Sequence, residues 1–254
     1  MKQIMESEHV FPPRTTEMET FFDTFIEMIG EKRIDSIVGM SPSFPNADYI
    51  IDKYEMLVEL KILESDFIKE DDIPNLTNRI LSSQKSADKA KKCNLLEFQS
   101  YFKEELDNSL VSLIRRRLGR IVEKANKQIK FTKKNGVGVI YKGVLVIIND
   151  KFTKVDHENT FRILCSVLSQ HNSSVDCLVY TTVNLWVDDG TDIAKLPWLT
   201  AYGDNTDDVF SGRVNSLGRD FFFYLEKKGI IELKHHEEFE SLDKFPKMRH
   251  IPLD

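Results

Sequence analysis

The alternation of apolar and polar residues predicts a β-hairpin over residues 46–63, "NADYIIDKYEMLVELKIL". With the turn centred on residues 53–54, facing positions have numbers that sum to 107, so Asp48 lies directly opposite Glu59. Because side chains alternate along a strand, Glu59 and Lys61 then share one face. The hairpin therefore gathers three charged side chains within an otherwise apolar pair of strands.

Helical spacing of apolar residues predicts an amphipathic helix over residues 15–32, followed by a strand in "RIDSIVGM" and then by the hairpin. Residues 74–108 have a polar, helical pattern. Residues 109–134 carry a clear apolar helical stripe. The first half of the chain is thus expected to contain three strands and several helices.

Three elements with a β-helix-β pattern follow. The continuous apolar run from Val144 to Ile148 predicts a strand buried on both faces. Residues 156–171 form a helix with Asp156 as its cap, and "VDCLVYTT" forms a second buried strand. This order implies a parallel pair joined by a right-handed crossover. The expected fold class is an α/β sandwich with a mixed central sheet.

The C-terminal part has a different pattern. Residues 183–209 are rich in turn-forming residues, and residues 210–229 form another helix. We therefore expect one domain over residues 1–182 and a C-terminal extension over residues 183–254. The pattern leaves open whether this extension is a separate unit or covers the sheet.

Composition limits the classes of function. The 254 residues are 41% hydrophobic, enough to bury a sizeable core, and the formal net charge of −6 argues against a protein that coats nucleic acid or membrane by bulk attraction. There is no apolar run long enough to cross a bilayer and no stretch of signal-peptide type. We expect a soluble, cytoplasmic protein with no membrane partner.

One segment departs from this acidic balance. Residues 112–134 contain nine Lys and Arg against one Glu. Four of these cations recur at intervals of three and four residues and are candidates for binding phosphates of nucleic acid. Two alternatives remain open: a solvated helix face, or a face that pairs with acidic parts of this or another chain. The four candidates are Arg116, Arg120, Lys124 and Lys127.

The facing acids of the hairpin need a physical reason, because like charges opposite one another destabilise a sheet. A divalent cation supplies one: Asp48, Glu59 and the backbone carbonyl of Leu60 offer oxygen ligands and leave room for the waters that Mg²⁺ retains. Lys61 could then hold a metal-bound water or stabilise charge on a phosphate. The alternative is a solvated strand face with a surface ion pair, which the apolar character of "MLVELKIL" disfavours.

With Asp48, Glu59 and Lys61 in "NAD…ELK", preceded by a helix and followed by helix-strand-helix-strand, residues 15–182 resemble the PD-(D/E)xK nuclease superfamily, which has the restriction-endonuclease-like fold. The resemblance implies that Asp48 and Glu59 are the metal-binding acids, Lys61 the catalytic lysine, and Mg²⁺ or Mn²⁺ the cofactor. Ala47 stands where the motif has proline. No Gln is followed by Tyr four residues later, which departs from the exonuclease branch.

The resemblance also implies a further acid from the first helix, with Glu19 or Glu27 as candidates; Asp52 is a less favoured choice for the first acid. The expected function is a metal-dependent endonuclease, with DNA favoured over RNA, in restriction or anti-phage defence. A homodimer or a partner protein from a defence system would fit that role. Two alternatives remain: an inactive nuclease-like module that binds nucleic acid or protein, and an immunity or regulatory protein that masks a basic partner.

Overall fold

A computed structural model describes residues 17–39, 44–171, 174–188, 196–230 and 247–250. Six strands form one mixed sheet in the order β1-β2-β3-β4-β5-β7, in which β3, β4 and β5 are parallel and the outer pairs are antiparallel. The expected α/β class with a mixed central sheet is confirmed. The strands of this sheet are β1 (Lys32–Arg33), β2 (Tyr49–Ile51), β3 (Met56–Leu63), β4 (Lys142–Asn149), β5 (Cys177–Thr182) and β7 (Trp198–Tyr202).

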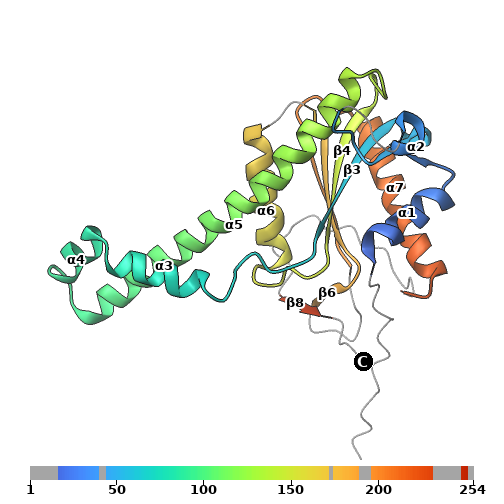
Figure 1. The fold of residues 1–254 in the computed structure, drawn as a ribbon. Coiled ribbons are helices and arrows are strands. Elements are labelled where there is room, and N and C mark those ends of the chain that lie inside the picture. Colours follow the sequence, from blue (N-terminus) through green and yellow to red (C-terminus); the bar gives the residue numbers. More distant parts are fainter. Residues whose placement is uncertain (1–16, 40–43, 172–173, 189–195, 231–246, 251–254) are drawn as a thin grey trace, which may run out of the picture.

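Helices cover both faces of the sheet (Figure 1). One apolar core joins the sheet to α1 and α7, and a second joins its other face to α5 and α6. A separate pair, β6 (Leu185–Asp188) and β8 (Lys247–His250), is antiparallel. The described helices are α1 (Met18–Met28), α2 (Asp35–Val38), α3 (Asp72–Leu81), α4 (Gln84–Ala90), α5 (Leu95–Lys134), α6 (His157–His171) and α7 (Asp208–Lys227).

The centre of the sheet follows the sequence pattern. The run from Val144 to Ile148 is fully buried in β4, which is parallel to β5 as expected. Asp156 caps α6, since its Oδ1 accepts a hydrogen bond from the N–H of Asn159 at 2.7 Å. These strands are buried on both faces because helices pack on each side, which explains the absence of alternation in their sequences.

The longest element is α5, a single helix of 40 residues. A capping box formed by Asn94 and Glu97 begins it. Its N-terminal part projects from the sandwich together with α3 and α4, and its C-terminal part lies along the sheet (Figure 1). We call residues 72–111 the arm. Within the described ranges no helix, α5 included, combines the length and apolarity needed to cross a membrane.

One expectation about an element is wrong, and one alternative that the sequence left open is decided. The strand expected in "RIDSIVGM" is wrong for most of its length: β1 ends at Arg33, and α2 follows and ends at Gly39, whose φ of 93° suits glycine. Hydrogen bonds from the Ser36 hydroxyl to the Arg33 carbonyl and from Asn46 to Asp35 stabilise this turn. In the C-terminal part, β7 pairs with β5, and α7 packs in the same apolar core as α1. Both elements therefore belong to the same sandwich as the N-terminal part.

Candidate metal site on strand β3

The β2–β3 hairpin has the register expected from the sequence. The observed pairs, Tyr49 with Val58 and Ile51 with Met56, each sum to 107. A short 3₁₀ turn over residues 52–54 joins the strands and ends at Glu55, whose φ of 54° is left-handed. Asp52 therefore lies in the turn, where its carboxylate accepts a hydrogen bond from the Tyr141 hydroxyl at 3.0 Å.

Asp48 comes one residue before β2, where the ladder ends, so the expected direct pairing with Glu59 is not observed. Its N–H donates instead to the carbonyl of Val58 at 3.1 Å. Its Oδ2 accepts a hydrogen bond from the N–H of Leu60 at 2.8 Å. The carboxylate thus takes the place that the next backbone carbonyl of β2 would occupy. Because N–H and C=O of one strand residue point to the same side, the carbonyl of Leu60 also faces the side of Asp48.

Glu59 occupies the middle of β3 and is 0% exposed. Its Oε1 forms an ion pair with the ammonium group of Lys61, and its Oε2 is buried without a hydrogen-bond partner among the described residues. The alternative of a solvated strand face is therefore wrong for Glu59. A buried carboxylate oxygen with no donor is costly, which calls for a ligand or a proton at this position.

Both acids have raised pKa values. Burial, and then the charge of Asp48, raise the pKa of Glu59 to about 8, against the opposing effects of Lys61 and Lys124. Burial also raises the pKa of Asp48, while Lys61, the Leu60 N–H and Arg33 act in the opposite direction. The charge of Asp48 makes Glu59 harder to ionise, and a bound cation would relieve this repulsion.

Lys61 follows Glu59 by two residues on the same face of β3, and its side chain is 19% exposed. It pairs with Glu59 and also lowers the pKa of Asp48 electrostatically. The ammonium group is therefore close to both acids and open to solvent on part of its surface. A phosphate that reaches the acids would meet this cation.

The first helix contributes a cluster next to Asp48. Arg33 forms ion pairs with Asp23 at 2.8 Å and Glu19 at 3.3 Å, and the Tyr49 hydroxyl donates a hydrogen bond to Asp23 at 2.7 Å. Arg33 and Glu19 both influence the pKa of Asp48, in opposite directions. Glu27 is exposed on α1 and makes no contact with the acids among the described residues. Of the two candidates, only Glu19 lies in the electrostatic environment of Asp48.

The described residues contain no group of three or more His, Cys, Asp or Glu side chains suited to a metal. Two carboxylates and a backbone carbonyl nevertheless fit the hard, oxygen-preferring ions, which keep several waters. The orphaned Oε2 of Glu59 is the observation that favours this fit. Asp48, Glu59 and Leu60 are the residues that would hold the ion.

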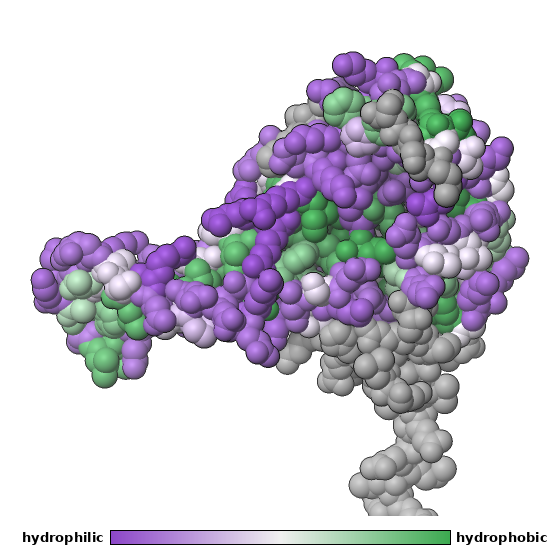
Figure 2. Space-filling model, in the orientation of Figure 1, coloured by the Kyte–Doolittle hydropathy of each residue, from purple (hydrophilic) through white to green (hydrophobic). Residues whose placement is uncertain are grey.

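The basic candidates lie on the solvent side of α5. Leu118 and its neighbours on the stripe are fully buried, and at about 100° per residue the cations Arg116, Arg120 and Lys127 lie roughly half a turn away from it. Arg116 and Arg120 form no ion pair with another described residue, whereas Lys127 pairs with Glu123 at 2.6 Å. Figure 2 shows strongly hydrophilic residues over the middle of α5, beside a hollow with apolar residues.

Lys124 differs from the other three basic candidates. It is exposed, yet its charge lowers the pKa of Glu59, so it lies on the side of α5 that approaches the acids. Another cation of α5, Arg117, forms an ion pair within the protein, with Asp72 of α3 at 3.2 Å. Of the four basic candidates, Lys124 is therefore the one whose charge acts on Glu59, and the other three lie along the exposed face of α5.

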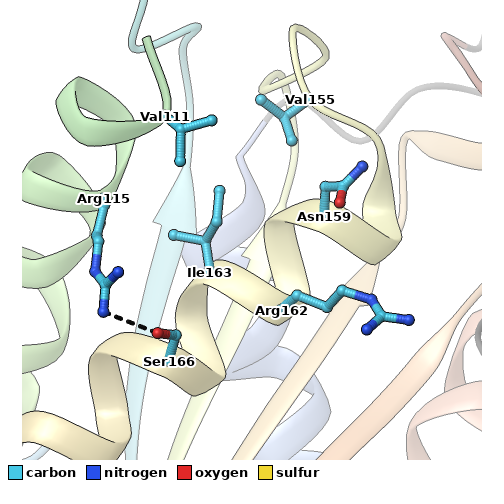
Figure 3. Close-up of a pocket in the computed structure, with 7 residues that line it drawn as sticks. All are labelled: Val111, Arg115, Val155, Asn159, Arg162, Ile163 and Ser166. Atoms are coloured by element: carbon cyan, nitrogen blue, oxygen red, sulfur yellow. Dashed lines mark hydrogen bonds between the residues drawn. The ribbon is translucent and has the colours of Figure 1, made fainter. Parts of the chain in front are cut away.

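A hollow between α5 and α6 is distinct from this site (Figure 3). Arg115 of α5 donates a hydrogen bond to Ser166 of α6 at 2.9 Å, and Ile163 and Val111 face the same space. By contrast, the segment that carries Asp48 contacts α5 through other residues, Gln128 and Thr132. The hollow therefore lies on the other side of α5 from the acids and contains none of the site residues.

In comparisons with protein-family models, curated proteins and solved structures, nothing matches this chain. Sequence reasoning missed Arg33, since nothing in its local pattern indicates a contact with α1 and Asp48. It also missed Thr132 and Gln128, which lie on the helix chosen for its charges but whose polar groups contact residues 46–47.

Proposed function

We propose that this protein is a divalent-metal-dependent phosphodiesterase of the PD-(D/E)xK type, with Mg²⁺ or Mn²⁺ as the cofactor. The observation that supports it best is the fully buried carboxylate of Glu59, which has one unpartnered oxygen and lies within the electrostatic influence of Asp48. A structural ion pair would have both oxygens satisfied, because an unmatched buried charge destabilises the fold. A cation between the two acids explains why the chain retains them.

In this proposal Asp48, Glu59 and the Leu60 carbonyl are the metal ligands. The ion, when bound, lowers the pKa of water and stabilises negative charge on a phosphate. Lys61 is the third catalytic residue: its ammonium group can donate hydrogen bonds to the attacking water or to a phosphate oxygen. Its partial exposure gives a substrate access from solvent.

Nucleic acid is the proposed substrate, with DNA preferred over RNA and cleavage within the strand. Support comes from the exposed cations Arg116 and Arg120, which lack ion-pair partners among the described residues, and from Lys124 beside Glu59. Contacts of this kind position the backbone without reading its sequence. The expected homodimer or defence partner stays a prediction.

The test is cleavage of circular single-stranded DNA, circular duplex DNA and RNA with Mg²⁺, Mn²⁺ or EDTA. We expect metal-dependent nicking by the wild type and a loss of at least about 100-fold in Glu59→Gln and Lys61→Met. Glu104→Gln and Lys103→Met are matched controls, since both residues are exposed on the arm. These controls should cleave like the wild type.

Two results would contradict the proposal. One is the absence of cleavage and of any metal-dependent rise in melting temperature with folded protein, since a ligand that binds the native state must stabilise it. The other is cleavage that survives in Glu59→Gln. Salt-dependent binding of nucleic acid without a metal effect would instead favour the inactive binding module.

A further inference from the structure

The segment that carries Asp48 is hydrogen-bonded to α5. The N–H of Ala47 donates to Thr132 Oγ1 at 2.7 Å, and Gln128 Nε2 donates to the carbonyl of Asn46 at 2.9 Å. The Thr132 hydroxyl in turn donates to the Gln128 carbonyl at 2.9 Å, which fixes its lone pairs toward Ala47. Both Thr132 and Ala47 are 0% exposed, so no water can replace the first bond.

This contact lies directly before the hairpin. Strand β2 contains only three paired residues, and Asp48 precedes the first of them. The Asp48 carboxylate accepts a hydrogen bond from the Leu60 N–H, and its backbone N–H donates to the Val58 carbonyl at 3.1 Å. Its backbone carbonyl accepts a hydrogen bond from the Ile34 N–H at 2.9 Å. Ala47 is the adjacent residue, so its bond to Thr132 adds a contact from α5 that fixes the chain directly before Asp48.

We propose that Thr132 is a positioning residue for the metal site: through Ala47 it helps to hold Asp48 in the place from which its carboxylate acts with Glu59. This inference rests on the proposed function. It makes α5 responsible for two parts of the reaction, since the same helix carries the exposed cations and fixes one of the two acids. Gln128 supports the same segment from one turn earlier on the helix.

The substitutions Thr132→Val and Thr132→Ser separate the hydrogen bond from the packing. Valine has a similar shape but leaves the buried N–H of Ala47 without an acceptor, which favours displacement of the segment. Serine retains the acceptor and loses only a methyl group. Thr160→Val is a matched control, because Thr160 is also 0% exposed and its hydroxyl bonds to the Val155 carbonyl at 3.3 Å, in α6 and away from the acids.

The first measurement is the dissociation constant of Mn²⁺ for each folded protein, from calorimetric titration of the full chain. Removal of a residue that orients a metal ligand typically weakens affinity by about 10- to 100-fold. We therefore expect at least a tenfold loss in Thr132→Val, near-wild-type binding in Thr132→Ser, and no change in Thr160→Val. Equal Mn²⁺ affinity in Thr132→Val and wild type would overturn the inference. If Thr132→Val does not fold, Gln128→Leu replaces it, and unchanged affinity there has the same meaning.

The second measurement needs no metal. The Leu60 amide donates to Asp48 Oδ2, so its hydrogen exchange reports the position of Asp48 directly. Thr132→Val should increase the exchange rate of Leu60 at least tenfold relative to Val146 on β4. Failure of the wild type to bind Mn²⁺ would reject the proposed function alone. An unchanged Leu60 rate would reject the role of Thr132, whatever the metal result.

Discussion

The two faces of strand β3 carry different kinds of side chain. Met56, Val58 and Leu60 point into the core shared with α1 and α7, which is built from aliphatic and aromatic side chains. Glu59 and Lys61 point to the other face, under α5. One strand thus contributes burial energy on one side and candidate chemistry on the other, because the period of two separates these roles residue by residue.

The polar residues on the α5 side also differ among themselves. Asn149 and Tyr180 are fully buried, but they satisfy each other: Asn149 Nδ2 donates to the Tyr180 hydroxyl at 2.9 Å and to the Phe152 carbonyl at 2.8 Å. Glu59 is equally buried and keeps an oxygen without a donor. A satisfied network stabilises the fold, whereas an unsatisfied carboxylate costs stability. We use this difference to distinguish a structural polar network from the candidate site.

Truncation of an aromatic residue in the core between the sheet, α1 and α7 should have the largest effect on stability. Phe25 is fully buried, with its ring centroid 5.2 Å from that of Phe221. Phe25→Ala should lower the free energy of unfolding by about 3–5 kcal/mol, as measured by urea denaturation. Phe223→Ala, at a side chain that is 48% exposed, is the control and should cost less than about 1 kcal/mol. An equal loss of unfolding free energy in the two variants would contradict the conclusion that this core stabilises the fold.

Replacement of Glu59 should instead increase the free energy of unfolding. The pKa of Glu59 is raised from 4.5 to about 8, so the folded state binds more protons than the unfolded state between these values, and stability falls as pH rises through this window. Glu59→Gln removes this cost and should raise the free energy of unfolding at pH 7 by roughly 1–3 kcal/mol in EDTA. Urea denaturation of Glu104→Gln is the control. A destabilised Glu59→Gln would show that Glu59 is a structural ion-pair residue.

Mn²⁺ binding should depend on pH for the same reason. A carboxyl group with a pKa of about 8 is mostly protonated at pH 6, and binding must release that proton. Affinity should therefore rise by up to about tenfold per pH unit from pH 6 to 8 and level off above it. Titration calorimetry in buffers of different ionisation enthalpy measures the protons released. Affinity that is constant across this range contradicts the assignment.

The smallest stability effect is expected on the exposed face of α5. Arg120→Ala should change the free energy of unfolding by less than about 0.5 kcal/mol, because its side chain has no ion-pair partner among the described residues. It should still reduce the salt dependence of DNA binding by about one unit of slope. Fluorescence anisotropy across a salt series measures this slope, with Lys103→Ala as the control. An unchanged slope would remove Arg120 from the interface.

The sequence pattern predicted those features of the fold that depend on the periodicity of neighbouring residues. Alternation and turn position predicted the register of the hairpin, and the apolar stripe predicted the sheet-facing side of α5. The apolar character of "MLVELKIL" indicated that Glu59 is not solvated, but it did not indicate which element buries Glu59, because that helix begins more than thirty residues later.

Contacts between distant residues account for what was missed. Ala47 and Thr132 are 85 positions apart, and a threonine inside a basic helix has no pattern that indicates a buried acceptor. The segment "RIDSIVGM" has an apolar content typical of a strand, but local hydrogen bonds from Ser36 and to Asp35 favour a helical turn. Position along the chain could not reveal that β7 completes the sheet beside β5.

The length of α5 has a mechanical consequence. Its 40 residues span about 60 Å, and the helix runs without interruption from the end of the arm to Thr132. A long helix bends only gently, so it transmits rotation from one end to the other. A tilt of about 5° at the sheet would move the far end of α5 by about 5 Å. The helix therefore acts as a lever: residues 95–111 project into solvent, and residues 112–134 lie against the sheet and the backbone that carries Asp48.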